Sequence, residues 1–238
     1  SSVEGDLGSH SEEQSAIALC SKEGEIMGKN LIVFDMDGTL YKTDTVSIPA
    51  TQKALEELGL PVLNADILRS FFGDPSDVFC SKIAPGAPED VIKKLEERIG
   101  FYELLYIPAM GELYDGIVEM LKVLEQKGFT LAICSHAGRE YIDCILKAFK
   151  LEYYFTHIKT YRPGTSKAEL LSELLKDVEP AAAVMVGDRF YDFEAAQANG
   201  IASIGVLYGY SRQEALSSDF PAENAEAVVE HTIRYFGL

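Results

Sequence analysis

The stretch Leu31–Leu40, with the sequence LIVFDMDGTL, decides how this chain is interpreted. Its first four residues are apolar, which predicts a fully buried strand that ends at Asp35. Asp37 lies two residues further on, and Gly38 and Thr39 predict a tight turn after the strand. A pair of carboxylates at the end of a buried strand favours phosphoryl transfer that depends on a divalent metal ion.

After residue 108 the apolar pattern alternates between strand and helix. Strands are predicted at residues 130–134, 155–160, 182–186 and 201–206. Helices are predicted at residues 115–126, 138–149, 166–176, 191–198 and 225–235, with Pro221 in a loop. Such alternation indicates a parallel sheet with helices on both faces.

The stretch between the first strand and this alternating part has no convincing strand. Apolar residues at helical spacing predict helices at residues 49–58, 65–72, 77–83 and 88–105. The predicted fold is therefore α/β, with a parallel-sheet, Rossmann-like core interrupted after its first strand by a helical cap. We assign residues 30–44 and 110–238 to the core and residues 45–109 to the cap. Residues 1–29 are expected to form an N-terminal extension, either flexible or docked on the body.

Composition limits the classes of partner. The net charge of -17 would repel a phosphate backbone, and no basic stripe offsets it, so nucleic acid is not an expected partner. No apolar run approaches the ~20 residues that span a bilayer, so no membrane partner is expected. The four cysteines have irregular spacing, which is typical of reduced thiols. We expect a cytoplasmic protein that is a monomer or a homodimer.

Further polar side chains follow the other predicted strands. Ser135 follows the second strand and Asp188 the fourth, with Asp192 one helical turn later; Lys167 starts the helix after the third strand. The carboxyl ends of parallel strands meet at one edge, so these groups should converge with Asp35. Clustered carboxylates repel each other, and Mg²⁺ removes that conflict. Lysine and serine suit the binding of phosphoryl oxygens.

These motifs resemble those of a known family. The segments D-M-D-G-T-L and G-D-R-F-Y-D, with the strand-end serine and the lysine between them, are similar to the four motifs of the haloacid dehalogenase (HAD) superfamily. The resemblance covers residues 30–210. The helical insert resembles the C1 cap of the phosphoglycolate phosphatase-like group.

The resemblance implies a role for each motif residue. Asp35 would be the nucleophile that becomes an aspartyl phosphate, and Asp37 the general acid and base. Mg²⁺ would be held by Asp35, the backbone carbonyl of Asp37, and Asp188. Asp192 would support the metal site from the second shell of ligands or pair with Lys167. The expected substrate-binding residues are Thr39, Ser135, His136 and Lys167, although His136 equally fits a loop histidine with a backbone partner.

The resemblance implies a magnesium-dependent phosphatase that acts on a small phosphorylated metabolite, such as phosphoglycolate, a nucleotide or a sugar phosphate. Asp37 argues against a dehalogenase, since dehalogenases lack this second acid. A phosphomutase of the β-phosphoglucomutase type is an alternative, disfavoured because residues 72–76 contain no arginine. A non-catalytic binding protein on the HAD fold is another. Arg162-Pro163 stands where many relatives have Lys-Pro, so Arg162 is a lesser candidate for the role given to Lys167.

Overall fold

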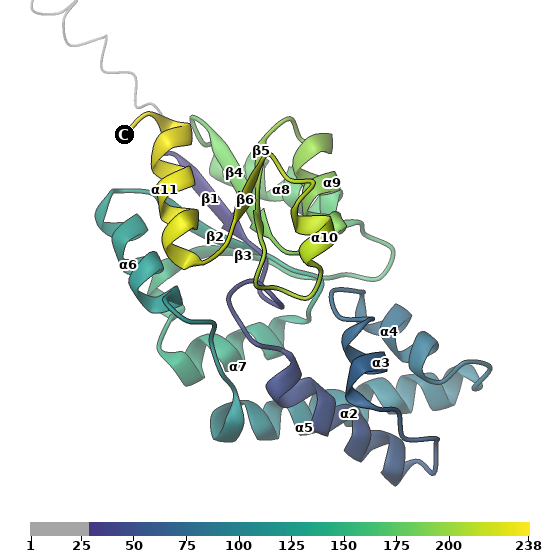
Figure 1. The fold of residues 1–238 in the computed structure, drawn as a ribbon. Helices are drawn as coiled ribbons and strands as arrows, with labels where there is room; N and C mark the ends of the chain where they lie inside the picture. Colours follow the sequence, from purple (N-terminus) through teal and green to yellow (C-terminus); the bar gives the residue numbers. More distant parts are fainter. Residues whose placement is uncertain (1–28) are drawn as a thin grey trace, which may run out of the picture.

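The core is a single parallel sheet (Figure 1), which confirms the predicted fold class. The computed structural model describes residues 29–238, so nearly all of the predicted N-terminal extension lies outside the described residues. The sheet has six parallel strands in the order β3-β2-β1-β4-β5-β6. They are β1 (Leu31–Phe34), β2 (Thr130–Cys134), β3 (Phe155–Lys159), β4 (Ala183–Gly187), β5 (Ala202–Val206) and β6 (Phe220–Ala222).

Helices cover both faces of this sheet, and its central strand β1 is apolar throughout. All four residues of β1 are buried; Ile32 and Phe34 belong to one hydrophobic cluster, Leu31 and Val33 to another. On the first face lie α6 (Ile117–Gln126), α7 (Arg139–Phe149) and α11 (Ala225–Phe236). On the second lie α8 (Lys167–Val178) and α9 (Phe190–Ala198). Because both faces are buried, the strand does not alternate apolar and polar residues as a half-exposed strand does.

The strand order places the ligand crevice. β1 pairs with β2 on one side and with β4 on the other. Strands progress outward in both directions from this point, and ligands of such sheets bind at the carboxyl ends of the strands beside it. Asp35 directly follows β1, and Asp188 directly follows β4. The motif residues therefore lie where the topology favours a binding site.

Four helices lie between β1 and α6: α2 (Asp44–Glu57), α3 (Ala65–Arg69), α4 (Ser76–Ile83) and α5 (Glu89–Met110). They form a blue group beside the sheet in Figure 1. Their apolar side chains pack in a cluster separate from both sheet clusters, with Leu55, Leu68 and Leu95 fully buried. We propose that this group is the cap, with the assigned boundaries 45–109.

Prolines account for three differences from the predicted elements. α2 begins at Asp44 and contains Pro49, which we had predicted to begin the helix. α5 continues through Pro108 to Met110. Proline has no N–H to bond the carbonyl four residues earlier, and Cys144 Sγ contacts that carbonyl, of Leu104, at 3.8 Å. The loop predicted at Pro221 is wrong: this residue lies in β6, an edge strand, where proline is tolerated.

The remaining features are two short helices, the three described cysteines and the apolarity of the helices. The 3-10 helix η1 (Glu152–Tyr154) was not predicted, and α10 (Arg212–Ala215) was not predicted as a separate element. The thiols of Cys80 and Cys134 are free and buried, and that of Cys144 is half-buried. None of the helices within residues 29–238 has the length and apolarity needed to cross a bilayer.

Candidate active site

The start of α8 determines the position of Lys167 in the site. Ser166 caps α8 as predicted: its hydroxyl accepts the backbone N–H of Glu169, whose carboxylate accepts the N–H of Ser166. Lys167 is therefore the first residue of α8, and its side chain is only 3 % exposed. Its ammonium lies 2.9 Å from Oδ1 of Asp35 and 2.5 Å from Oδ1 of Asp192.

The Lys167 ammonium keeps its charge between these two carboxyl groups. Burial alone would lower the pKa of the Lys167 ammonium, but the charges of Asp192 and Asp35 outweigh burial and raise this pKa above its ordinary value. Asp192 also accepts the backbone N–H of Arg189 through Oδ2, at 3.1 Å. Asp35 accepts the N–H of Met36 through Oδ1, the oxygen that faces the lysine. The structure thus brings Lys167, and not Arg162, to Asp35: Arg162 is half exposed and pairs with Glu173 at 2.6 Å.

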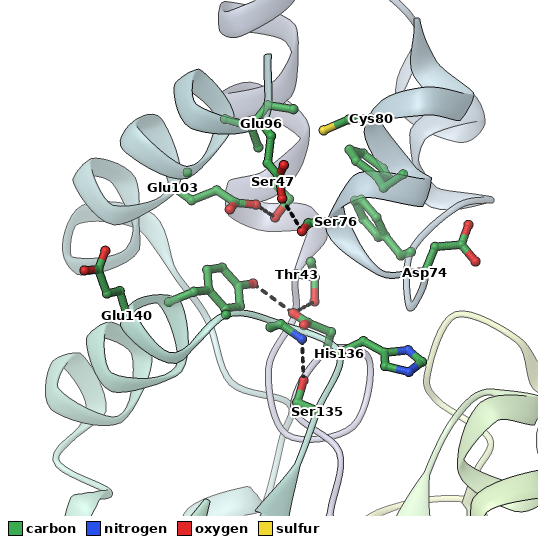
Figure 2. A pocket seen from close by; sticks show the side chains of 18 of the residues that line it. Thr43, Ser47, Asp74, Ser76, Cys80, Glu96, Glu103, Ser135, His136 and Glu140 are labelled. Carbon is green, nitrogen blue, oxygen red and sulfur yellow. Dashed lines mark hydrogen bonds between the residues drawn. The ribbon is translucent and has the colours of Figure 1, made fainter. Parts of the chain in front are cut away.

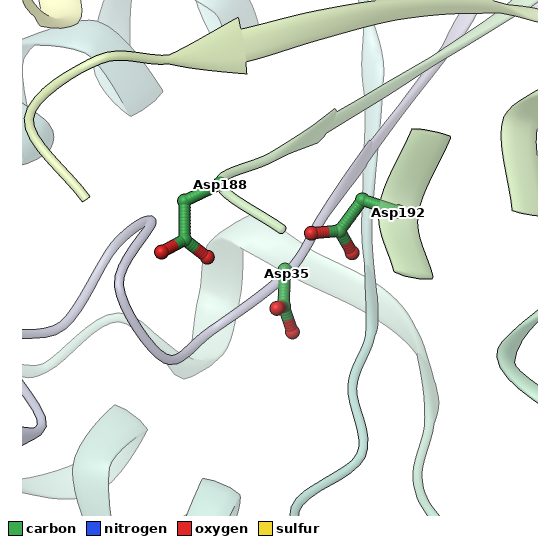
Figure 3. Close-up of side chains that lie close together, drawn as sticks. All are labelled: Asp35, Asp188 and Asp192. Atoms are coloured by element: carbon green, nitrogen blue, oxygen red, sulfur yellow. The ribbon is translucent and has the colours of Figure 1, made fainter. Parts of the chain in front are cut away.

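Three buried carboxylates, of Asp35, Asp188 and Asp192, face a common space (Figure 3). One oxygen from each lies within 4.8 Å of the others. Asp188 accepts the backbone N–H of Tyr210 through Oδ2 at 2.7 Å, while its buried Oδ1 has no hydrogen-bond partner among the described residues. Burial and the neighbouring charges of Asp192 and Asp35 raise the pKa of Asp188 well above its ordinary value. An unpartnered carboxylate oxygen in such a cluster fits a small divalent cation.

Glycine is required where the turn after β1 meets this cluster. Gly38 has φ +73°, and a Cβ at this position would collide with the Asp188 carboxylate. The positive φ and the missing side chain together let the loop pass directly over Asp188. The glycine of the D-x-D-G motif is thus a steric requirement of the acidic cluster.

Asp37 points away from the acidic cluster. Its Oδ1 accepts the hydroxyl of Thr43 at 2.6 Å and that of Tyr141, on α7, at 2.8 Å. Burial and the charge of Asp35 raise the pKa of Asp37 to about 6, while the two hydroxyl donors partly oppose the shift. A carboxyl whose pKa lies near neutrality suits a group that must both donate and accept a proton. The side chain of Asp37 therefore adds no ligand to the acidic cluster; its predicted contribution was the backbone carbonyl.

The predicted substrate-binding residues lie in different surroundings. Ser135 is buried at the end of β2, and its hydroxyl accepts the N–H of Ala137 at 3.1 Å. His136 contacts the carbonyl of Gly73 at 3.1 Å through Nδ1 and so joins the core to the helical cap. Thr39 is fully buried and is not part of the cavity wall described next.

A cavity of about 620 Å³ lies between the sheet and the cap (Figure 2). Asp35, Asp37, Ser135 and His136 line the core side. The cap side is lined by apolar side chains and by two serine–glutamate pairs: Ser47 donates to Glu103, and Ser76 donates to Glu96. Burial raises the pKa of Glu103 to about 7, an effect that the Ser47 hydrogen bond partly opposes.

Sequence reasoning missed residues that complete the site from the turn before α2, from α7 and from the cap. Thr43 and Tyr141 bond Asp37, and Glu103 lies in the cavity wall, yet none of them is part of a strand-end motif. The spacing of six residues between Asp37 and Thr43 carried no recognisable signal. Tyr141 lies 104 residues from its partner, so only the packed structure reveals the contact.

Comparison with known proteins identifies the family. Residues 32–206 match the model of the haloacid dehalogenase-like hydrolases. The chain is 31% identical over 209 residues to tyrosine-protein kinase PtkA of Mycobacterium tuberculosis, covering 84% of this chain and 68% of that protein. It is 28% identical over 216 residues to a phosphoglycolate phosphatase of Vibrio parahaemolyticus, covering 84% and 94%.

Solved structures agree with the fold. A predicted phosphoglycolate phosphatase from Haemophilus somnus superposes with a TM-score of 0.79 at 24% identity, covering 88% of this chain and all of that one. A predicted phosphatase from Clostridium acetobutylicum gives a TM-score of 0.76 at 23% identity, covering 87% and 99%. The chain therefore belongs to the haloacid dehalogenase-like hydrolases, and its relatives support a phosphatase.

Proposed function

We propose that the protein is a magnesium-dependent phosphatase that hydrolyses a small phosphomonoester through an aspartyl phosphate on Asp35. One observation carries this proposal. The carboxylate of Asp35 lies in the cavity wall, is paired with a buried lysine, and adjoins the unpartnered Oδ1 of Asp188. This set combines a nucleophile, a cation for the phosphoryl oxygens and a position for a metal ion.

The donor set fits Mg²⁺, which prefers a few hard oxygen ligands. Asp35 and Asp188 would hold the ion, together with the backbone carbonyl of Asp37 that the resemblance implies. Asp192 is bound by Lys167 and by a backbone N–H, so it suits a supporting role. The ion supplies positive charge that offsets the repulsion between the carboxylates and the phosphate.

The protein's own residues account for the two chemical steps. An Asp35 oxygen attacks phosphorus, the bond from phosphorus to the leaving alcohol breaks, and Asp37 gives its proton to the departing oxygen. Asp37 then accepts a proton from water as that water attacks phosphorus, so that inorganic phosphate leaves and Asp35 is restored. Lys167 and Ser135 would bind the phosphoryl oxygens as charge develops.

The relatives named phosphoglycolate phosphatase make phosphoglycolate the first substrate to test, with nucleotides and sugar phosphates beside it. A second candidate function is transfer of the phosphoryl group to an acceptor hydroxyl instead of water. The relative named a tyrosine-protein kinase is the observation that favours this candidate, and a phosphomutase would belong to the same class. Product analysis separates the two, since hydrolysis releases one inorganic phosphate for each ester consumed.

The test is phosphate release from phenyl phosphate with Mg²⁺. We expect release by the wild type and a loss of at least about 10³-fold in Asp35→Asn, since that variant lacks the nucleophile. Asp90→Asn is the matched control, because Asp90 is an exposed aspartate on α5. Equal rates in Asp35→Asn and the wild type would contradict the assignment of the nucleophile.

A further inference from the structure

The cap side of the cavity is built for an apolar body. Phe71, Phe72 and Phe79, from the segment between α3 and the end of α4, line it opposite Ile99 and Leu104 of α5. Phe72 and Phe79 pack against each other with ring centroids 6.1 Å apart. A cavity of about 620 Å³ is within the range that holds drug-sized ligands. Such a volume and wall suit an alcohol of aromatic size.

Carboxyl groups supply the polar part of this wall. Glu96 and Glu103 reach it from α5, and Figure 2 shows both beside Ser47 and Ser76. Ser47 donates its hydroxyl to Glu103, and Ser76 donates its hydroxyl to Glu96. One oxygen of each glutamate therefore accepts a hydrogen bond from an uncharged group. A carboxylate accepts several hydrogen bonds, and both therefore retain capacity for a donor on the ligand.

Within residues 29–238, no unpaired lysine or arginine balances these carboxyl groups. Among the residues that line the cavity, Arg139 is the one lysine or arginine; its side chain is 58 % exposed and bonds both oxygens of Asp143 at 2.9 Å. The Lys167 ammonium is held by Asp35 and Asp192 at the phosphoryl end. His136 does not compensate, because burial and the charge of Lys167 lower its pKa to about 4 and leave the ring neutral near pH 7.

An anionic leaving group would therefore be desolvated among carboxyl groups without a counter-charge. Burying an unpaired charge is costly, and a like charge nearby adds to the cost. An uncharged alcohol avoids this cost. An alcohol with a hydroxyl or ammonium donor gains hydrogen bonds from the free capacity of Glu96 and Glu103.

We propose that this cavity selects phosphomonoesters of alcohols that have an apolar, aromatic-sized body, at least one hydrogen-bond donor and no negative charge. Glu96 and Glu103 act as the specificity residues that bind the donor. This inference rests on the proposed phosphatase function and narrows it: esters whose leaving group carries a carboxylate, phosphoglycolate among them, become poor substrates.

The test uses aryl phosphates that share one body and differ at its far end. They are the phosphate esters of tyramine, of 4-ethylphenol and of 3-(4-hydroxyphenyl)propionate, which carry an ammonium, no charge and a carboxylate. With Mg²⁺ near neutral pH, we expect kcat/KM to fall in that order, with the ammonium ester at least about tenfold above the carboxylate ester. Phosphoglycolate should rank with the carboxylate ester.

Variants connect this ranking to the two glutamates. In the double variant Glu96→Gln/Glu103→Gln the ammonium and carboxylate esters should differ by less than about threefold, since neutral amides do not distinguish the charges. Glu89→Gln, at an exposed position of the same helix, should keep the wild-type ratio. Equal kcat/KM values for the three esters in the wild type, or a preference for the carboxylate ester, would overturn the proposal.

A binding measurement separates this proposal from the proposed function. Calorimetry with Asp35→Asn gives the affinities of the three esters without turnover, and we expect the same order. The reverse order or equal affinities would overturn the substrate class even if the wild type hydrolyses every ester. The expected order together with no phosphate release by the wild type would support the substrate class and contradict the phosphatase.

Discussion

Replacing Glu103 by glutamine should change how the stability of the protein depends on pH. Glu103 lies half-buried on α5, where it accepts the hydroxyl of Ser47. Burial raises the pKa of its carboxyl from 4.5 to about 7, and no cation is paired with it among the described residues. Glutamine keeps the shape and the acceptor but cannot ionise, so the substitution isolates the cost of the charge.

The direction of the pH effect on stability follows from the difference between the pKa values of Glu103 in the folded and unfolded states. The folded protein holds the Glu103 proton more tightly than the unfolded chain does, so the free energy of unfolding falls as the pH rises from 4.5 through about 7. The shift of about 2.5 pKa units corresponds to at most about 3 to 4 kcal/mol, since one pKa unit is about 1.4 kcal/mol. About 2 kcal/mol of this develops between about pH 5.5 and 8.5. Glu103 is partly exposed in the cavity wall, and solvent screening makes both figures upper limits.

The assay is urea unfolding of the wild type, Glu103→Gln and Glu89→Gln across this pH range. We expect the free energy of unfolding of Glu103→Gln to gain on the wild type as the pH rises, by up to about 2 kcal/mol. Glu89 is 83 % exposed and pairs with Lys93 at 2.8 Å, so its variant should not gain with rising pH. A constant difference between Glu103→Gln and the wild type, or one that shrinks as the pH rises, would refute the reasoning.

Three further predictions concern the core. Tyr141→Phe removes a donor that lowers the pKa of Asp37, the proposed general acid, so the pH profile of kcat should move to higher pH; an unchanged profile would count against this contact. Gly38→Ala should lose more stability than Gly59→Ala: both have positive φ, costing about 1–2 kcal/mol, but only at Gly38 does the new methyl meet the Asp188 carboxylate. Equal losses in urea unfolding would exclude that collision. Lys167→Met leaves two buried carboxylates without their cation and should cost about 3–5 kcal/mol, less when Mg²⁺ is added; a loss independent of Mg²⁺ would contradict the proposed metal position.

The sequence predicts the core well because each core feature has a local cause. Continuous apolar runs mark the central strands, and parallel strands must deliver their ends to one edge of the sheet. This logic brings Asp35, Asp188 and Lys167 together, as the structure shows. The serine cap at the start of α8 is equally local, since its two hydrogen bonds join residues three positions apart.

The parts that could not be predicted depend on long-range packing. Tyr141 reaches Asp37 only because α7 packs beside the turn that follows β1, a contact between distant parts of the chain. Glu103 lies in the cavity wall because α5 packs against α2, whose Ser47 donates to it. Local rules also predicted that α5 ends before Pro108, whereas it continues to Met110. Pro221 suggested a loop for the same reason, yet its missing N–H is harmless at the edge of the sheet.

The central claim is that Asp35 carries the phosphoryl group during turnover. The direct measurement is to mix the wild type with phenyl phosphate and Mg²⁺, stop the reaction during the steady state, reduce the acyl phosphate with borohydride, and locate the modified residue by peptide mass spectrometry. We expect modification at Asp35, and more of it in Asp37→Asn, which lacks the base for the second step. Steady turnover with modification at another residue, or with none, would contradict it.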